Sequence, residues 1–172
     1  MFLNYTKNFI VKKTLKKGLR DLKIDDSCYA IKKIGIVVDT SHFKDTESLV
    51  KQLESSGIHK ENIKVIEYSD TYCKSEIKTY NCFGVSDLKW NGKISSTLVN
   101  DFINEDFDLL ISYYDIEKAI LLRVTHSSKA VFKVGFSSID KRLNHLMIET
   151  EVSDFALFIH ELFKYLKVLN KI

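Results

Sequence analysis

Short runs of apolar, mostly β-branched residues alternate along this chain with amphipathic segments of about three turns. Apolar runs of four to eight residues are typical of buried strands, and segments with a 3.6-residue apolar period are typical of helices. Strands separated by helices pair in parallel through right-handed crossovers. We therefore expect an α/β fold: a three-layer Rossmann-like sandwich of about five mainly parallel strands. The expected strands are 33–38, 62–68, 107–112, 130–136 and 145–149, and the expected helices are 45–56, 95–104, 115–127 and 153–169.

The alternation of strand-like and helix-like segments is least regular between residues 69 and 95. Here Cys82-Phe83 and Leu88–Trp90 are expected to form a small hairpin, with Asn91-Gly92 as its turn. Gly57 is expected to end the second helix.

The first 24 residues carry a charge unlike the rest of the chain. They hold seven basic residues and one acidic residue, whereas the remainder holds 19 basic and 22 acidic residues. An asymmetry of this kind indicates an anionic partner for one end of the protein. We expect residues 1–24 to form a basic amphipathic helix beside a single α/β domain over 31–172.

A helical period over 8–23 places Val11, Leu15, Leu19 and Leu22 on one narrow arc, with basic residues beside it. The leading interpretation is a cytoplasmic binding module whose basic helix contacts RNA or a ribonucleoprotein, with an anionic membrane surface as a second partner. An equal alternative is that the apolar arc docks on the domain and leaves the lysines solvated. The predicted partner-binding residues are Lys12, Lys13, Lys16, Lys17, Arg20 and Lys23.

Polar residues follow each expected strand, where open parallel sheets bind their ligands. Asp39 and His42 follow the first strand and are weak candidates for a carboxylate-oriented general base; otherwise Asp39 caps a turn and His42 is a loop residue. After the fourth strand, capping-box spacing predicts exposed amides at a helix start beside two cations, the features of an anion site; otherwise this segment is an ordinary capped turn with solvated charges. The residues of this possible anion site are Ser137, Ser138, Lys141 and Arg142.

These residues support an alternative function, a small transferase or hydrolase that acts on a phosphorylated or sugar-like substrate. No cofactor is expected: the first strand is followed by Asp-Thr-Ser-His-Phe-Lys-Asp, without the glycines that let a pyrophosphate approach the backbone. No metal is expected either, because the five histidines never recur at three or four residues. The three cysteines, Cys28, Cys73 and Cys82, lack ligand spacing and are expected to be reduced thiols.

Several aromatic side chains lie near expected strand ends or in the irregular region. They can stack on bases or sugars, although aromatics in such places more often pack in or around a core. They are Tyr68, Tyr72, Tyr80, Trp90, Tyr113 and Tyr114.

Three blocks of the chain resemble an uncharacterised family of small bacterial proteins: FDLLISYYD at 107–115, AVFKVGFSSIDKRLNHLMIET at 130–150, and FIHELFKYLKVLNKI at 158–172. That resemblance implies a domain of unknown function and no activity. Residues 108–136 also resemble the N-terminal half of heptosyltransferase-like glycosyltransferases, in a DLLI strand, a helix, Ala130 and a KVGF strand. This second resemblance implies a Rossmann-like topology but no transfer chemistry, because those enzymes need a second nucleotide-sugar domain.

Overall fold

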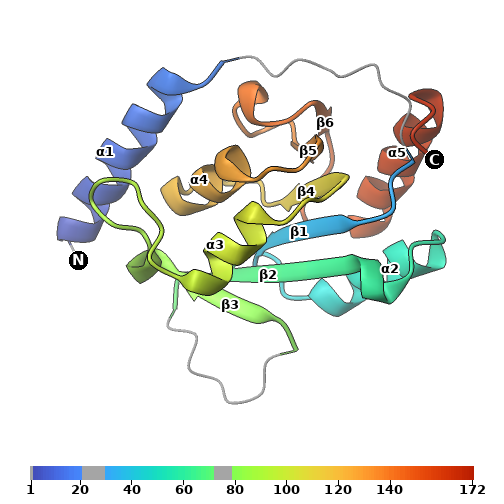
Figure 1. Cartoon of the computed structure of the whole chain (residues 1–172), viewed down its shortest axis with the longest axis horizontal. Helices are drawn as coiled ribbons and strands as arrows, with labels where there is room; N and C mark the ends of the chain where they lie inside the picture. The colour runs from blue at the N-terminus through green and yellow to red at the C-terminus, as the bar shows by residue number, and fades with distance from the viewer. Residues whose placement is uncertain (1, 21–29, 72–78) are drawn as a thin grey trace.

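The computed structural model describes residues 2–20, 30–71 and 79–172. Its six strands form one parallel sheet in the order β3-β2-β1-β4-β5-β6 (Figure 1). This order is that of doubly wound Rossmann-like sheets, in which the strand order reverses between β1 and β4. The predicted α/β class is confirmed, with one strand more than expected. The strands are β1 Ile34–Asp39, β2 Ile63–Ser69, β3 Asn81–Gly84, β4 Leu109–Tyr113, β5 Phe132–Phe136 and β6 Leu146–Ile148.

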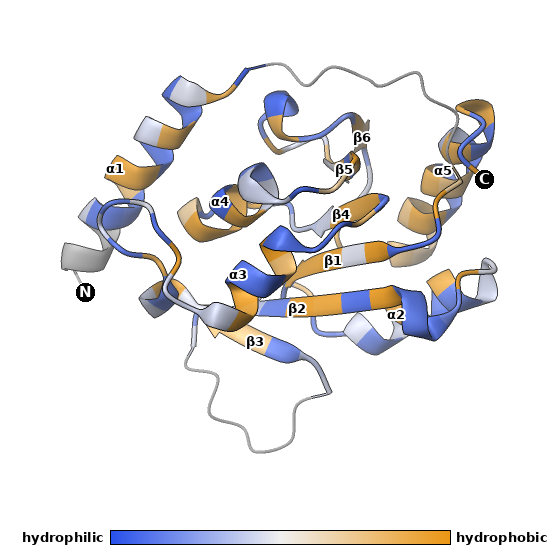
Figure 2. Ribbon diagram, viewed as in Figure 1, coloured by the Kyte–Doolittle hydropathy of each residue, from blue (hydrophilic) through white to orange (hydrophobic). Residues whose placement is uncertain are grey.

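The central strands form the core of the sheet. Every residue of β1, β4 and β5 is buried, as expected for parallel strands covered on both faces. In Figure 2, β1 and β4 are accordingly mostly orange. Gly35 in β1 is needed for close packing, because a Cβ atom there would lie 2.8 Å from ring atoms of Phe107.

Helices cover both faces of the sheet. Helices α2 (Thr46–Ser55) and α5 (Phe155–Val168) contact one another, as do α3 (Thr97–Asn104) and α4 (Ala119–Ser127). Local sequence sets these helix ends: the Asp45 and Ser96 side chains accept hydrogen bonds from the amides of Ser48 and Val99. Gly57, with φ of +98°, follows α2 as predicted.

Helix α1 (Phe2–Gly18) lies beyond the carboxyl ends of the strands, at the opposite end of the molecule from α5 (Figure 1). It packs against α4 through Val11, Leu15 and the following Leu19, all of which are buried. The helix begins and ends earlier than expected, and Gly18 is its last residue. The predicted contributions of Leu22 and Lys23 lie outside the described residues.

The irregular region contains a strand that the sequence analysis paired wrongly. Cys82 and Phe83 belong to β3, which pairs in parallel with Glu67 and Tyr68 of β2 rather than with Leu88–Trp90. The turn at Asn91-Gly92 is correct, but it joins Leu88 to Ile94 through an antiparallel bridge. Cys82 is disulfide-bonded, so the expectation of three reduced thiols is also wrong.

The structure lacks two of the predicted helix starts. Helix α4 begins at Ala119 rather than at 115, and Ile116, expected on its apolar face, is 44% exposed. After β5, no α-helix begins at Ser137, and the alternative of a capped turn agrees with the structure: a single 3₁₀ turn, Lys141–Leu143, is capped by Asp140, whose side chain accepts from the amide of Arg142. In both places, the backbone conformation follows from contacts of residues 115–118 and 140–142 with neighbouring elements. The helical pattern of the local sequence does not decide it.

No helix in the described part of the chain is long and apolar enough to cross a membrane. The cytoplasmic location stays a prediction, and a disulfide at Cys82 would be uncommon in a reducing cytosol.

Candidate functional site

Helix α1 covers part of the sheet edge at which a Rossmann-like fold would bind a ligand. The Nζ atom of Lys7 donates to the Leu88 carbonyl at 2.8 Å, beyond the end of β3. The Nζ atoms of Lys12 and Lys16 lie 2.8 and 2.6 Å from the carboxylate of Glu117, beyond the end of β4. Apolar docking and three bound cations therefore hold α1 across this edge.

Asp39, a predicted catalytic residue, lies at the end of β1 with only 2% of its surface exposed. Its Oδ1 accepts from the Ser41 amide at 3.0 Å, and its Oδ2 lies 2.7 Å from Nζ of Lys118. The amide of His42 donates to the Asp39 main-chain carbonyl at 3.2 Å, and the His42 side chain is exposed. Within the described residues, no hydrogen bond joins the Asp39 carboxylate to the His42 imidazole.

Lys118 is the central group of this edge, and it is not among the residues predicted from the sequence. Its Nζ also lies 2.6 Å from Oδ2 of Asp70 and 4.8 Å from the ring centre of Tyr68. The Tyr68 hydroxyl donates to Asp70 Oδ1 at 2.6 Å. Partial burial opposes ionisation of Asp70, but hydrogen bonds from Lys118 and Tyr68 outweigh it and lower the pKa of this carboxyl. Burial, reinforced by the bond to Asp70, raises the pKa of the Tyr68 hydroxyl.

A cavity of about 310 Å³ lies between α1, the end of β2 and the start of α4. The charged side chains that line it, among the residues the structure describes, are two cations, Lys12 and Lys118, and two anions, Asp70 and Glu117. Each cation is paired with an anion of the same set, so the cavity presents no surplus positive charge to a phosphate.

The predicted anion site after β5 is spread over exposed and internally bonded groups. Ser137 and Lys141 are exposed, and the Ser138 hydroxyl donates to the Asp115 carbonyl at 2.8 Å. Arg142 donates to Asp140 through Nε at 2.9 Å and Nη2 at 2.6 Å. These bonds lower the pKa of Asp140 to about 2. The guanidinium is thus already bound to a carboxylate, and its role in binding an anion stays a prediction.

The outward face of α1 carries basic side chains that take no part in the ion pairs described above. Lys13, Lys17 and Arg20 are exposed, and none of them forms an ion pair within the described residues. A shallow groove of about 400 Å³ runs along this face and is lined by Phe9 and by lysines at 12, 13, 16 and 17. Phe9 is 58% exposed, and Nζ of Lys13 lies 5.9 Å from its ring centre. We call this surface the cationic face of α1.

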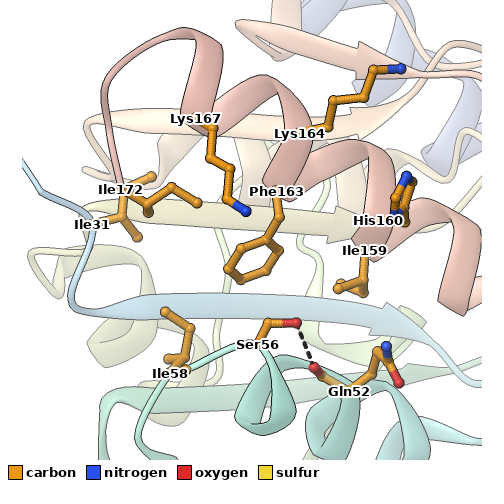
Figure 3. A pocket seen from close by; sticks show the side chains of 11 residues that line it. Ile31, Gln52, Ser56, Ile58, Ile159, His160, Phe163, Lys164, Lys167 and Ile172 are labelled. Carbon is orange, nitrogen blue, oxygen red and sulfur yellow. Dashed lines mark hydrogen bonds between the residues drawn. The ribbon is translucent and has the colours of Figure 1, made fainter.

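A larger pocket, of about 820 Å³, lies between α2 and α5 (Figure 3). Its apolar part includes Ile58, Ile159 and Phe163, and the Lys167 side chain extends beside Phe163 while Lys164 points away. Among the described residues, the lining includes the imidazole of His160 but no acidic side chain, and these residues offer no carboxylate–imidazole pair for acid–base chemistry. None of the predicted site residues that the structure describes lines it.

Residues 7–169 match the model of a family of unknown function, DUF6913, and the chain belongs to this family. The match agrees with the resemblance of the three sequence blocks. No curated protein and no solved structure matches the chain. The likeness of 108–136 to heptosyltransferase-like enzymes stays a prediction.

Proposed function

We propose that this member of the DUF6913 family is a non-catalytic RNA-binding module, and that the cationic face of α1 contacts the phosphates of RNA or of a ribonucleoprotein. One observation carries the proposal: α1 is docked by its apolar side, so Lys13 and Lys17 are held outward on a fixed helix, and the exposed Arg20 follows two residues after its end. A fixed row of cations loses less conformational freedom on binding than a row on a mobile arm would.

The same arrangement favours RNA over a membrane surface. An interfacial helix binds lipid by burying its apolar face in the bilayer. In α1 the apolar side chains Val11 and Leu15 are already buried in the protein, and between residues 6 and 20 only Phe9 and Ile10 are exposed large hydrophobic side chains. Electrostatic binding to phosphates needs no such apolar face.

The number of outward cations predicts how strongly RNA affinity depends on salt. Lys12 and Lys16 are both bound to the Glu117 carboxylate, so the exposed cations available to phosphates in the described part of this segment are three: Lys13, Lys17 and Arg20. For a single strand, three phosphate contacts predict that log K falls with log salt with a slope of about −2.

The test is the affinity of the full chain for a single-stranded RNA, measured by fluorescence anisotropy between about 50 and 200 mM salt. The double variant Lys13→Glu/Lys17→Glu should lose binding. The matched control, Lys164→Glu/Lys167→Glu, makes the same charge change on α5 at the other end of the molecule and should bind like the parent. Equal losses in both variants, or binding to anionic vesicles but not to RNA at low salt, would contradict the proposal.

The alternative, a small transferase or hydrolase acting on a phosphorylated or sugar-like substrate, has less support. Its base candidate Asp39 is buried and paired with Lys118, and its anion clamp Arg142 is paired with Asp140. Both groups would have to exchange a close partner for substrate, whereas the cationic face of α1 needs no rearrangement.

A further inference from the structure

A second pocket, of about 310 Å³, lies on the other side of α1 from Glu117. It is formed by the Ile10, Thr14 and Gly18 side of α1, by the turn at 90–92, and by Arg123 and His126 of α4. We call it the Trp90 pocket. Its volume is at the lower end of the range for small-molecule sites, which suits one planar group rather than a large ligand.

The groups around the Trp90 pocket have the chemistry that recognises a nucleobase. Trp90 is 55% exposed, and an exposed indole offers a face on which a base can stack. Arg123 is half-buried, and no acidic partner of its guanidinium lies within the described residues, so it can stack on a base or donate to its edge. Burial, together with Arg123 and Lys133, lowers the pKa of His126, which keeps a neutral imidazole with one donor and one acceptor at pH 7.

The turn that carries Trp90 is well fixed. The amide of Lys89 donates to the Lys93 carbonyl at 2.8 Å, and Oδ1 of Asn91 accepts from the Lys93 amide at 3.0 Å. Gly92 supplies the positive φ of +76° that the turn requires. Lys7 ties the base of this turn to α1 through the Leu88 carbonyl. The backbone that carries Trp90 is therefore held beside α1 before any ligand arrives.

The Trp90 pocket adjoins the cationic face. Ile10, Thr14 and Gly18 form one row of α1, and Lys13 and Lys17 form the neighbouring row. A base in the pocket would place its own phosphate, or the next one, beside these lysines.

We propose that Trp90 and Arg123 hold one unpaired base of a single-stranded RNA whose phosphates contact Lys13 and Lys17. This inference rests on the proposed RNA-binding function and adds to it a preference for unpaired strands. In a duplex the base would first have to leave its stack, which disfavours entry into the pocket.

The sole tryptophan of the chain makes the test direct, because all indole fluorescence comes from Trp90. The 172-residue chain is titrated with an oligoadenylate of about ten nucleotides, and separately with a duplex of the same length. The single strand should quench the fluorescence and bind more tightly than the duplex. Loss of stacking in Trp90→Ala should weaken single-strand binding by roughly 5- to 150-fold, and Trp90→Phe should recover part of it.

Tyr165→Ala is the matched control, because Tyr165 is an exposed aromatic side chain on α5, far from α1. It should bind the oligoadenylate like the parent chain. If RNA binds in a manner dependent on Lys13 and Lys17 but Trp90→Ala binds equally well, or duplex and single strand bind alike, the base pocket is refuted and the proposed function stands. If neither RNA binds at low salt, the proposed function fails and the inference fails with it.

Discussion

Nζ of Lys118 lies 2.7 Å from Oδ2 of Asp39, a carboxylate that is almost completely buried at the end of the first strand. Lys118 comes from the loop before α4, so this pair fastens the β4–α4 connection to the β1 end on the neighbouring strand. A charge at this depth is tolerated only with a close partner and hydrogen bonds, and Asp39 has both in Lys118 and the Ser41 amide.

Replacement of this lysine should therefore be costly. Lys118→Met leaves the buried Asp39 carboxylate without its cation, and we expect the free energy of unfolding to fall by about 3 kcal/mol. Urea denaturation followed by circular dichroism measures the change. The double variant Asp39→Asn/Lys118→Met should regain part of the loss, because it removes the unpaired charge. Lys164→Met, which breaks only an exposed pair with Glu161, should leave stability unchanged; a similar loss there would rule out burial as the cause.

Gly35 in β1 is expected to tolerate substitution poorly, because its neighbours leave little room for a side chain. Gly35→Ala places a methyl group 2.8 Å from the Phe107 ring, and we expect overpacking to cost about 1–3 kcal/mol of unfolding free energy. Gly18→Ala is the control, because nothing lies within 4 Å of a Cβ at the end of α1. Differential scanning calorimetry should show a lower Tm for the first variant and an equal or higher Tm for the second. Equal Tm values would show that Phe107 moves aside at little cost.

The sequence predicted those parts of the fold whose signals are local. Apolar runs identified the buried strands β1, β4 and β5, and Asp45 and Gly57 marked the ends of α2. Strand β3 was paired wrongly because it is a four-residue edge strand, and its parallel partner is remote in the sequence. The start of α4 was placed too early because Ile116 fits the 3.6-residue period, although it lies in a loop.

The site was less predictable because it depends on strand order. The sequence placed Asp39 and Asp70 at the ends of β1 and β2, but it could not show that a lysine beyond β4 joins them. The charge pattern of α1 likewise could not distinguish Lys12 and Lys16, which face Glu117, from Lys13 and Lys17, which face outward. One sequence feature could have marked Lys118 as a site residue: it lies five residues after the carboxyl end of β4.

Acid should weaken the contact between Asp140 and Arg142. The bonds from Arg142 lower the pKa of Asp140 from 3.8 to about 2, so the ionised carboxylate stabilises the folded state at pH values above its ordinary pKa. This stabilisation declines as the pH falls from about 4 towards 2, as the folded-state carboxyl becomes protonated. We expect Asp140→Asn to melt below the parent at pH 6, with a difference in Tm that closes over that window. A difference that stays constant down to pH 2 would show that the ionisation of Asp140 is not its source.

Glu117 is expected to limit the number of cations that α1 offers to RNA. Its carboxylate binds both Lys12 and Lys16, and these bonds lower the pKa of Glu117 despite its partial burial. Glu117→Gln removes the negative charge, so both lysines can turn to phosphates, and five cations predict a salt slope of about −3.5 instead of −2. The same variant should increase amide hydrogen exchange in α1, because this helix loses two of the ion pairs that hold it to the domain.

The control is Glu161→Gln, which removes the carboxylate paired with Lys164 on α5 and should change neither the salt slope nor the exchange in α1. If Glu117→Gln loosens α1 but leaves the salt slope unchanged, Lys12 and Lys16 do not reach RNA, and the contact surface is confined to Lys13, Lys17 and Arg20.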